Sequence, residues 1–186
     1  MNRKELRLSG FGGQGIVLAG LIVGKAASIF DGKNATFTQA YGPEARGGSC
    51  SAQLVITDEA AAYPYISNPS VVVAMSQEAY TKYAAPMGEE VQVIIDEDLV
   101  KPNKAQESRV LKVPATGIAK ELGRSAVANI VMLGFLTAVS KITSVDAMKK
   151  AVLDSVPKGT EELNTNAFNR GYECGKERIK DMGAKK

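Results

Sequence analysis

The chain has 186 residues, of which 45% are hydrophobic, so it can bury a sizeable core and a disordered chain is excluded. A formal net charge of +3 is too small to indicate a nucleic-acid partner. There is no histidine, and the two cysteines, Cys50 and Cys174, lie far apart. This composition excludes His-dependent nucleophilic sites, a disulfide framework and an iron–sulfur ligand set.

The N-terminal residues lead into a strand-like pattern with no apolar signal region before it. The longest apolar stretch, residues 126–139, is interrupted by Asn129 and Thr137 and is shorter than the ~20 residues that span a bilayer. We therefore expect a cytoplasmic protein that binds neither membranes nor nucleic acid.

The first elements form a strand–loop–helix unit. Residues 4–9 alternate polar and apolar and predict a strand, and residues 16–27 have apolar or small side chains at helical spacing. Between them, Gly10, Gly12 and Gly15 form a G-x-G-x-x-G pattern. Free N–H groups at the helix start could bind an anion there. A tight turn with nothing bound is the alternative.

A second glycine-rich segment, residues 41–48, joins predicted strands at 35–39 and 50–57. A parallel pair needs a longer crossover, so these strands should be antiparallel if they are neighbours, which makes the sheet mixed. Arg46 could bind a carboxylate or phosphate through both arms of its guanidinium, or could simply face water in a surface turn. Both glycine-rich segments follow strands, so they could converge on one edge of the sheet.

The remaining chain completes a single α/β domain over residues 1–186. The apolar run at 70–75 predicts a strand covered on both faces, followed by a helix to about residue 84. Further strands are expected at 91–95 and 109–113, and helices from residue 114 onward, with the one from 125 buried. We predict a mixed, mostly parallel sheet flanked by helices, with a Rossmann-like glycine-rich loop after the first strand.

Several single residues have ordinary structural interpretations. Ser76 is expected to cap the helix that follows it, and the two cysteines to pack as small hydrophobic side chains. Asn129, in an apolar helix, is expected to be a satisfied buried polar group or a contact to a partner. No ionisable pair is recognisable as an acid–base or nucleophilic site, so we expect no catalytic residue in this chain.

A free-standing dinucleotide-binding protein should carry an acidic residue at the end of its second strand, to hold the adenosine ribose. That position falls near Thr38 or Gln39, and Glu44 lies beyond it in a turn. The sequence therefore argues against NAD, although a nucleotide in another pose stays open.

The motifs together resemble the gamma subunit of 2-oxoacid:ferredoxin oxidoreductases. The resemblance rests on residues 10–16, 41–48, 129–134 and 166–168 and extends to about Gly171. Residues 75–80 are most similar to the subunits that act on 2-oxoglutarate. The small subunit of indolepyruvate oxidoreductase, which shares this domain, is the alternative within the family. A purely structural interaction module is a further alternative.

The resemblance implies a complex that oxidatively decarboxylates a 2-oxoacid to an acyl-CoA and passes electrons to ferredoxin. Thiamine diphosphate with Mg is expected between alpha and beta subunits, and iron–sulfur clusters in the beta or a ferredoxin-like delta subunit. This chain is expected to hold no metal or tightly bound cofactor, but to help close the active site and admit coenzyme A. The candidate residues for contact with coenzyme A or partner subunits are Gly10, Gly12, Gly13, Gln14, Gly15, Tyr41, Gly42, Arg46, Gly47 and Gly48.

Overall fold

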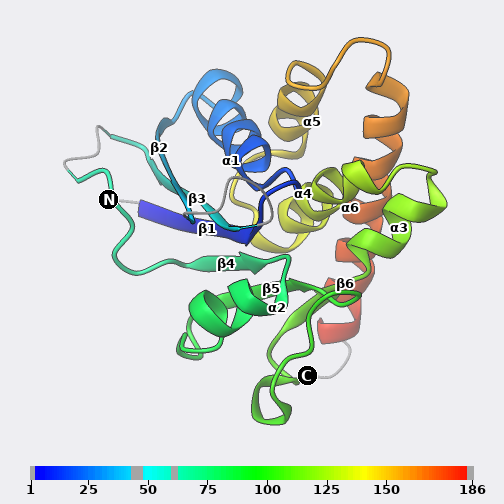
Figure 1. The fold of residues 1–186 in the computed structure, drawn as a ribbon. Coiled ribbons are helices and arrows are strands. Elements are labelled where there is room, and N and C mark those ends of the chain that lie inside the picture. Colours follow the sequence, from blue (N-terminus) through cyan, green and yellow to red (C-terminus); the bar gives the residue numbers. More distant parts are fainter. Residues whose placement is uncertain (1–2, 43–47, 60–62, 184–186) are drawn as a thin grey trace.

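The fold is built on a six-stranded sheet with the strand order β2-β3-β1-β4-β5-β6 (Figure 1). The computed structural model describes residues 3–42, 48–59 and 63–183. The strands are β1 (Arg3–Phe11), β2 (Asn34–Tyr41), β3 (Ser49–Thr57), β4 (Val71–Ala74), β5 (Gln92–Asp96) and β6 (Leu111–Val113).

The sheet is mixed, as predicted. β1, β4, β5 and β6 run parallel as successive neighbours, while β3 is antiparallel to both β1 and β2. The β2–β3 pairing runs from Asn34 opposite Thr57 to Tyr41 opposite Cys50. The short connection between these strands leaves no room for a crossover helix, so the antiparallel prediction is confirmed.

Helices cover the sheet unequally. One face carries the long helical layer, and the other carries α2 (Gln77–Ala79) with the π-helical turn Tyr80–Ala84 over β4 and β5 (Figure 1). The helices of the long layer are α1 (Ile16–Lys25, continued by the π-helical turn Ala26–Phe30), α3 (Ala115–Glu121), α4 (Ala128–Ser140), α5 (Val145–Leu153) and α6 (Glu161–Gly183). Short 3₁₀ turns occupy Lys104–Gln106 and Ser125–Val127.

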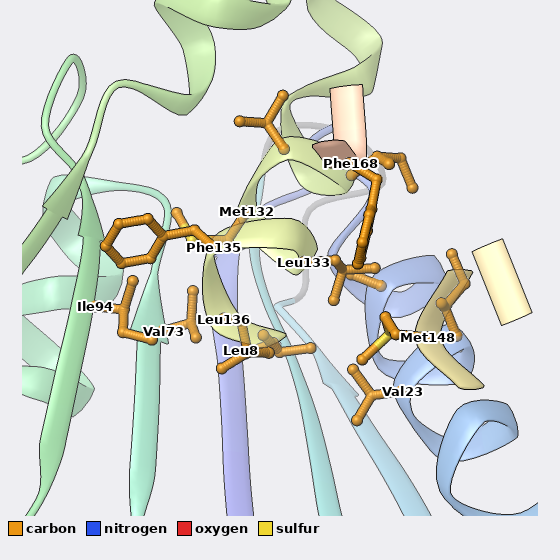
Figure 2. Packing of buried hydrophobic residues seen from close by; sticks show 14 of the residues in the cluster. Leu8, Val23, Val73, Ile94, Met132, Leu133, Phe135, Leu136, Met148 and Phe168 are labelled. Atoms are coloured by element: carbon orange, nitrogen blue, oxygen red, sulfur yellow. The ribbon is translucent and has the colours of Figure 1, made fainter. Parts of the chain in front are cut away.

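Helix α4 lies at the centre of the main core, which confirms the predicted buried helix, although the α-helix begins at Ala128 after the 3₁₀ turn Ser125–Val127 and not at residue 125. Figure 2 shows Phe135 and Leu136 directed toward the sheet residues Leu8, Val73 and Ile94. On its other side α4 packs on α6 and α5, where Leu133, Phe168 and Met148 meet (Figure 2). An apolar surface on every side of a helix is stable only when every side is covered.

The contact between α4 and α6 depends on glycine. A Cβ atom added to Gly171 of α6 would overlap the carbonyl oxygen of Val131 and lie 3.1 Å from its Cα. A Cβ added to Gly134 of α4 would overlap the carbonyl oxygen of Phe168. The backbones of the two helices therefore come into direct contact. This contact helps to hold α4 between α6 and the sheet.

Candidate functional site

The two glycine-rich segments meet at one edge of the sheet. The amide N–H of Gly12 donates to the carbonyl oxygen of Gly48 over 2.9 Å. At the start of the second glycine-rich segment, the N–H of Gly42 donates to the carbonyl oxygen of Ser49 over 2.6 Å. The predicted convergence is confirmed for the backbone, whereas Arg46 and Gly47 lie outside the described residues.

The first glycine of the pattern belongs to a strand, not to the loop as predicted. Gly10 pairs with Cys50, and Phe11 pairs with Ser49, so β1 continues two residues past the predicted end at residue 9. The turn itself is Gly12–Gly15, in which Gly13 and Gly15 have positive φ angles of 104° and 72°. Only glycine adopts such angles without steric cost, so the turn depends on these two residues.

Gln14 holds the turn against the carboxyl ends of β1 and β4. Its Oε1 accepts from the N–H of Phe11 over 2.9 Å, and its Nε2 donates to the carbonyl oxygen of Met75 over 2.6 Å. A Cβ atom at Gly10 would overlap this same Oε1. Glycine at position 10 thus allows the Gln14 amide to fold back over the strand.

Helix α1 begins without a side-chain cap. Gly15 is its N-cap residue, in a left-handed conformation, and the first turn contains no acidic residue. The first N–H groups of a helix have no partner inside the helix, and the positive end of the helix dipole lies beside them. The start of α1 can therefore accept an anion.

Asn129 reaches this turn from helix α4. Its Nδ2 donates to the carbonyl oxygen of Gly15 over 3.2 Å, and the side chain is buried. The expectation of a satisfied buried polar group is confirmed, but sequence reasoning did not connect the residue to the loop. The one available signal was a single amide in the first half of the helix, where its neighbours from Ala128 to Leu136 are apolar or glycine.

Two exposed aromatic side chains lie at strand ends on this edge of the sheet. Phe11 ends β1 with 40% of its surface exposed, and Tyr41 ends β2 with 63% exposed. Large aromatic groups at a rim favour contact with another molecule, since they offer apolar area at small entropic cost.

Asp96 ends β5 at the same edge of the sheet but serves the fold. Its buried carboxylate accepts from the hydroxyl and the N–H of Thr116 over 2.6 and 3.2 Å, and from the N–H of Asp98 over 3.2 Å. Burial raises the pKa of Asp96, and this effect outweighs the hydrogen bonds, which act to lower it. The carboxylate thus anchors the start of α3. Ser76, after β4, accepts from the N–H of Ala79 as the predicted cap of α2.

The sheet order is not that of a dinucleotide-binding domain. In such a domain the first two strands are parallel neighbours around the glycine loop. Here β3 lies between β1 and β2 and runs against both. The likeness to a dinucleotide-binding domain is therefore limited to the strand–turn–helix unit, because the second strand cannot supply the ribose-binding position beside β1.

Comparison with known proteins identifies the family. The family model described as pyruvate ferredoxin/flavodoxin oxidoreductase matches residues 5–174. The chain belongs to this family. It is 53% identical over 178 residues to the 2-oxoglutarate synthase subunit KorC of Methanocaldococcus jannaschii, covering 94% of this chain and 95% of that one.

Solved structures of the family have the same fold. The gamma subunit of keto/oxoacid ferredoxin oxidoreductase from Geobacter sulfurreducens matches with a TM-score of 0.83 and 39% identity, over 94% of this chain and 97% of that one. The 2-oxoglutarate:ferredoxin oxidoreductase of Magnetococcus marinus, solved with 2-oxoglutarate, coenzyme A and succinyl-CoA, matches with a TM-score of 0.84. At 22% identity, over 95% of this chain and 32% of that one, this match shows the fold alone.

The later family motifs lie in the helical layer. Residues 129–134 form the first half of α4, and Ala167 and Phe168 of α6 pack into the core while Asn166 is exposed. No helix in the part of the chain that the structure describes is both long and apolar enough to cross a membrane. Within those same ranges no group of three or more His, Cys, Asp or Glu residues could hold a metal ion.

Proposed function

We propose that this chain is the gamma-type subunit of a 2-oxoglutarate:ferredoxin oxidoreductase. The complex would convert 2-oxoglutarate and coenzyme A into succinyl-CoA and CO₂, with two electrons passing to ferredoxin. The observation that carries the proposal is the 53% identity to a 2-oxoglutarate synthase subunit over nearly the whole of both chains. The indolepyruvate and free-standing nucleotide alternatives are not favoured, since the similarity and the strand order both argue against them.

The reactive groups would come from partner chains. Thiamine diphosphate would supply the electron sink for decarboxylation, held with Mg between alpha and beta subunits. A cluster needs several thiolates, and the two cysteines of this chain pack in or against the core, so clusters would belong to the beta or a delta subunit. The compartment we propose is the cytoplasm, where such thiols stay reduced.

The role we propose for this chain is to bind coenzyme A at the glycine turn. The uncapped start of α1 offers backbone N–H groups and a positive dipole end, which suit a phosphate group. Arg46, in the adjoining segment, has the paired donors that bind phosphate or carboxylate. Contact of these same residues with partner subunits alone is the competing proposal.

Purification from the native cell under anaerobic conditions tests the assignment of the complex. The chain should co-purify with cluster-containing subunits and thiamine diphosphate, and the preparation should reduce ferredoxin faster with 2-oxoglutarate than with pyruvate or ketoisovalerate. A preference for pyruvate would overturn the assignment of 2-oxoglutarate as the substrate. Recovery of the chain with no other subunit would overturn the complex.

Substitution of Arg46 tests the coenzyme A role in the assembled complex. Arg46→Ala should raise the KM for coenzyme A about tenfold or more, and Arg46→Lys should recover part of that loss, because one charge remains without the fork. Arg170→Ala, at an exposed arginine of α6 that forms a surface ion pair with Glu121, is the matched control. An unchanged KM for coenzyme A with intact assembly would remove Arg46 from the site.

A further inference from the structure

Asn129 is the one buried polar side chain in the first half of α4. The other buried residues of α4 between Ala128 and Leu136 are apolar or glycine, and Asn129 itself is 3% exposed. A buried amide costs free energy unless it is hydrogen-bonded, and an apolar side chain would pack here without that cost. Core packing alone therefore does not explain an amide at this position.

The partner of that amide is the residue that begins α1. The carbonyl oxygen of Gly15 accepts from Asn129 Nδ2 over 3.2 Å and also accepts the first helical hydrogen bond, from the N–H of Ala19, over 2.9 Å. A Cβ atom at Gly15 would overlap the Asn129 amide. One side chain thus holds the carbonyl of Gly15 and fills the space beside its Cα.

The glycine turn is braced from two sides by amides. Gln14 ties the turn to the ends of β1 and β4, through Phe11 and Met75. Asn129 ties it to α4, and in the described residues no other side chain bonds to the backbone of Gly12–Gly15. The helical side of the turn therefore relies on Asn129.

We propose that Asn129 is a positioning residue, which holds the Gly12–Gly15 turn and the uncapped start of α1 in the shape that binds an anion. It acts through Gly15 and touches no ligand itself. Its effect on coenzyme A rests on the function proposed above, whereas its effect on the shape of the turn does not.

The surroundings of Asn129 provide a matched control. Asn129 and Asn164 both line a cavity of about 180 Å³ between the starts of α1, α4 and α6. Asn164 is 5% exposed, and its amide donates only within its own helix region, to the backbone and hydroxyl oxygens of Thr160. Truncating either residue enlarges an existing cavity, and only one of the two changes removes a bond to the turn.

The test compares Asn129→Ala, Asn129→Asp and Asn164→Ala in the assembled complex. Asp has the size of Asn but presents oxygen where the donor stood. Both Asn129 variants should raise the KM for coenzyme A about five- to tenfold, the effect of one lost hydrogen bond, with kcat and the KM for 2-oxoglutarate within twofold. Amide hydrogen exchange in residues 12–18 should quicken about tenfold. Asn164→Ala should match the native complex in both measurements.

Two outcomes separate this inference from the proposed function. Faster exchange in the turn with an unchanged KM for coenzyme A supports the positioning role and overturns the coenzyme A site. Unchanged exchange in both Asn129 variants overturns the positioning role.

A double variant keeps the test decisive if a single variant assembles poorly. Gly15→Ala should speed amide exchange in residues 12–18 by a larger factor in the native protein than in the Asn129→Ala protein, since the missing amide leaves room for the new methyl group. If the fold-change in exchange for the double variant equals the product of the two single fold-changes, the inference is overturned. Gly15→Ala with Asn164→Ala should multiply, because Asn164 has no bond to Gly15.

Discussion

Substitution of Glu5 probes a buried carboxylate that joins the sheet to the β3–β4 connection. Glu5 is 4% exposed, and one of its carboxylate oxygens accepts from the N–H groups of Ser67 and Asn68 over 2.6 and 2.7 Å. The other oxygen accepts from Nε of Arg3 over 2.7 Å and from the hydroxyl of Ser67 over 3.2 Å. Burial opposes ionisation, but these hydrogen bonds outweigh it and lower the pKa of Glu5.

Glu5→Gln keeps the size of the side chain and removes its charge. The glutamine oxygen can keep the two backbone N–H groups, while its NH₂ group then faces Arg3 and repels it. Hydrogen bonds to a charged acceptor contribute about 1.5–3 kcal/mol each, so we expect a loss of about 2–4 kcal/mol in the free energy of unfolding. At roughly 2–4 °C per kcal/mol for a chain of this size, Tm should fall by roughly 4–16 °C.

The pH dependence gives the sign of the effect. Because the folded state lowers the pKa of Glu5, its stabilisation is present above the ordinary glutamate pKa of about 4.3 and is lost as pH falls through the folded pKa. Urea unfolding followed by circular dichroism should therefore show the full difference from the native protein at pH 7. The difference should shrink steadily on acidification below pH 4.

Glu107→Gln is the control for that experiment. Glu107 also pairs with a cation, Lys112, over 2.7 Å, but the Glu107 side chain is 57% exposed to solvent. Exposed pairs contribute little, so its unfolding midpoint should stay at the native value. A Glu5→Gln protein as stable as this control at pH 7, or a difference that persists at low pH, would refute the reasoning.

Three further predictions concern the core and the buried acids and thiols. Gly171→Ala should cost at least about 3 kcal/mol in thermal unfolding, because the methyl group meets the Val131 backbone, while Gly183→Ala in open space should be neutral within about 1 kcal/mol. Asp96→Asn should flatten the pH dependence of stability: burial raises the pKa of Asp96, so its contribution is greatest below the ordinary aspartate value and declines as pH rises through the folded pKa. Urea unfolding at a series of pH values measures this. A free energy of unfolding that changes more steeply with pH in Asp96→Asn than in the native protein, above the ordinary aspartate pKa, would contradict the prediction. Burial raises the pKa of the Cys50 thiol, so mass spectrometry should find it labelled by a thiol reagent slowly until urea unfolds the chain; rapid native labelling would contradict the packing.

The order and type of the elements could be predicted from local patterns. Alternation marked β1 and β3, a continuous apolar run marked β4, and apolar residues on all sides marked α4 as buried. The short connection between β2 and β3 predicted their antiparallel pairing. Boundaries were less accurate: β1 extends to Phe11 because Ser49 continues the ladder, a fact that belongs to the partner strand.

The candidate site was predicted in part. The glycines marked the turn, since positive φ angles leave a direct trace in the choice of residue. The two amides that brace it left no such trace. Gln14 bonds to a carbonyl 61 residues away, and Asn129 to one 114 residues away, and no local pattern encodes contacts at that separation.

The sequence by itself determined a mixed α/β sheet, two glycine-rich segments, and a composition without histidine or clustered cysteines. Only the tertiary structure decided that β3 lies between β1 and β2, which removes the dinucleotide arrangement that the glycine pattern had suggested. It also decided that α4 places Asn129 against Gly15. Residue choice records local backbone needs, whereas strand order and long-range contacts follow from how the whole chain buries its apolar surface.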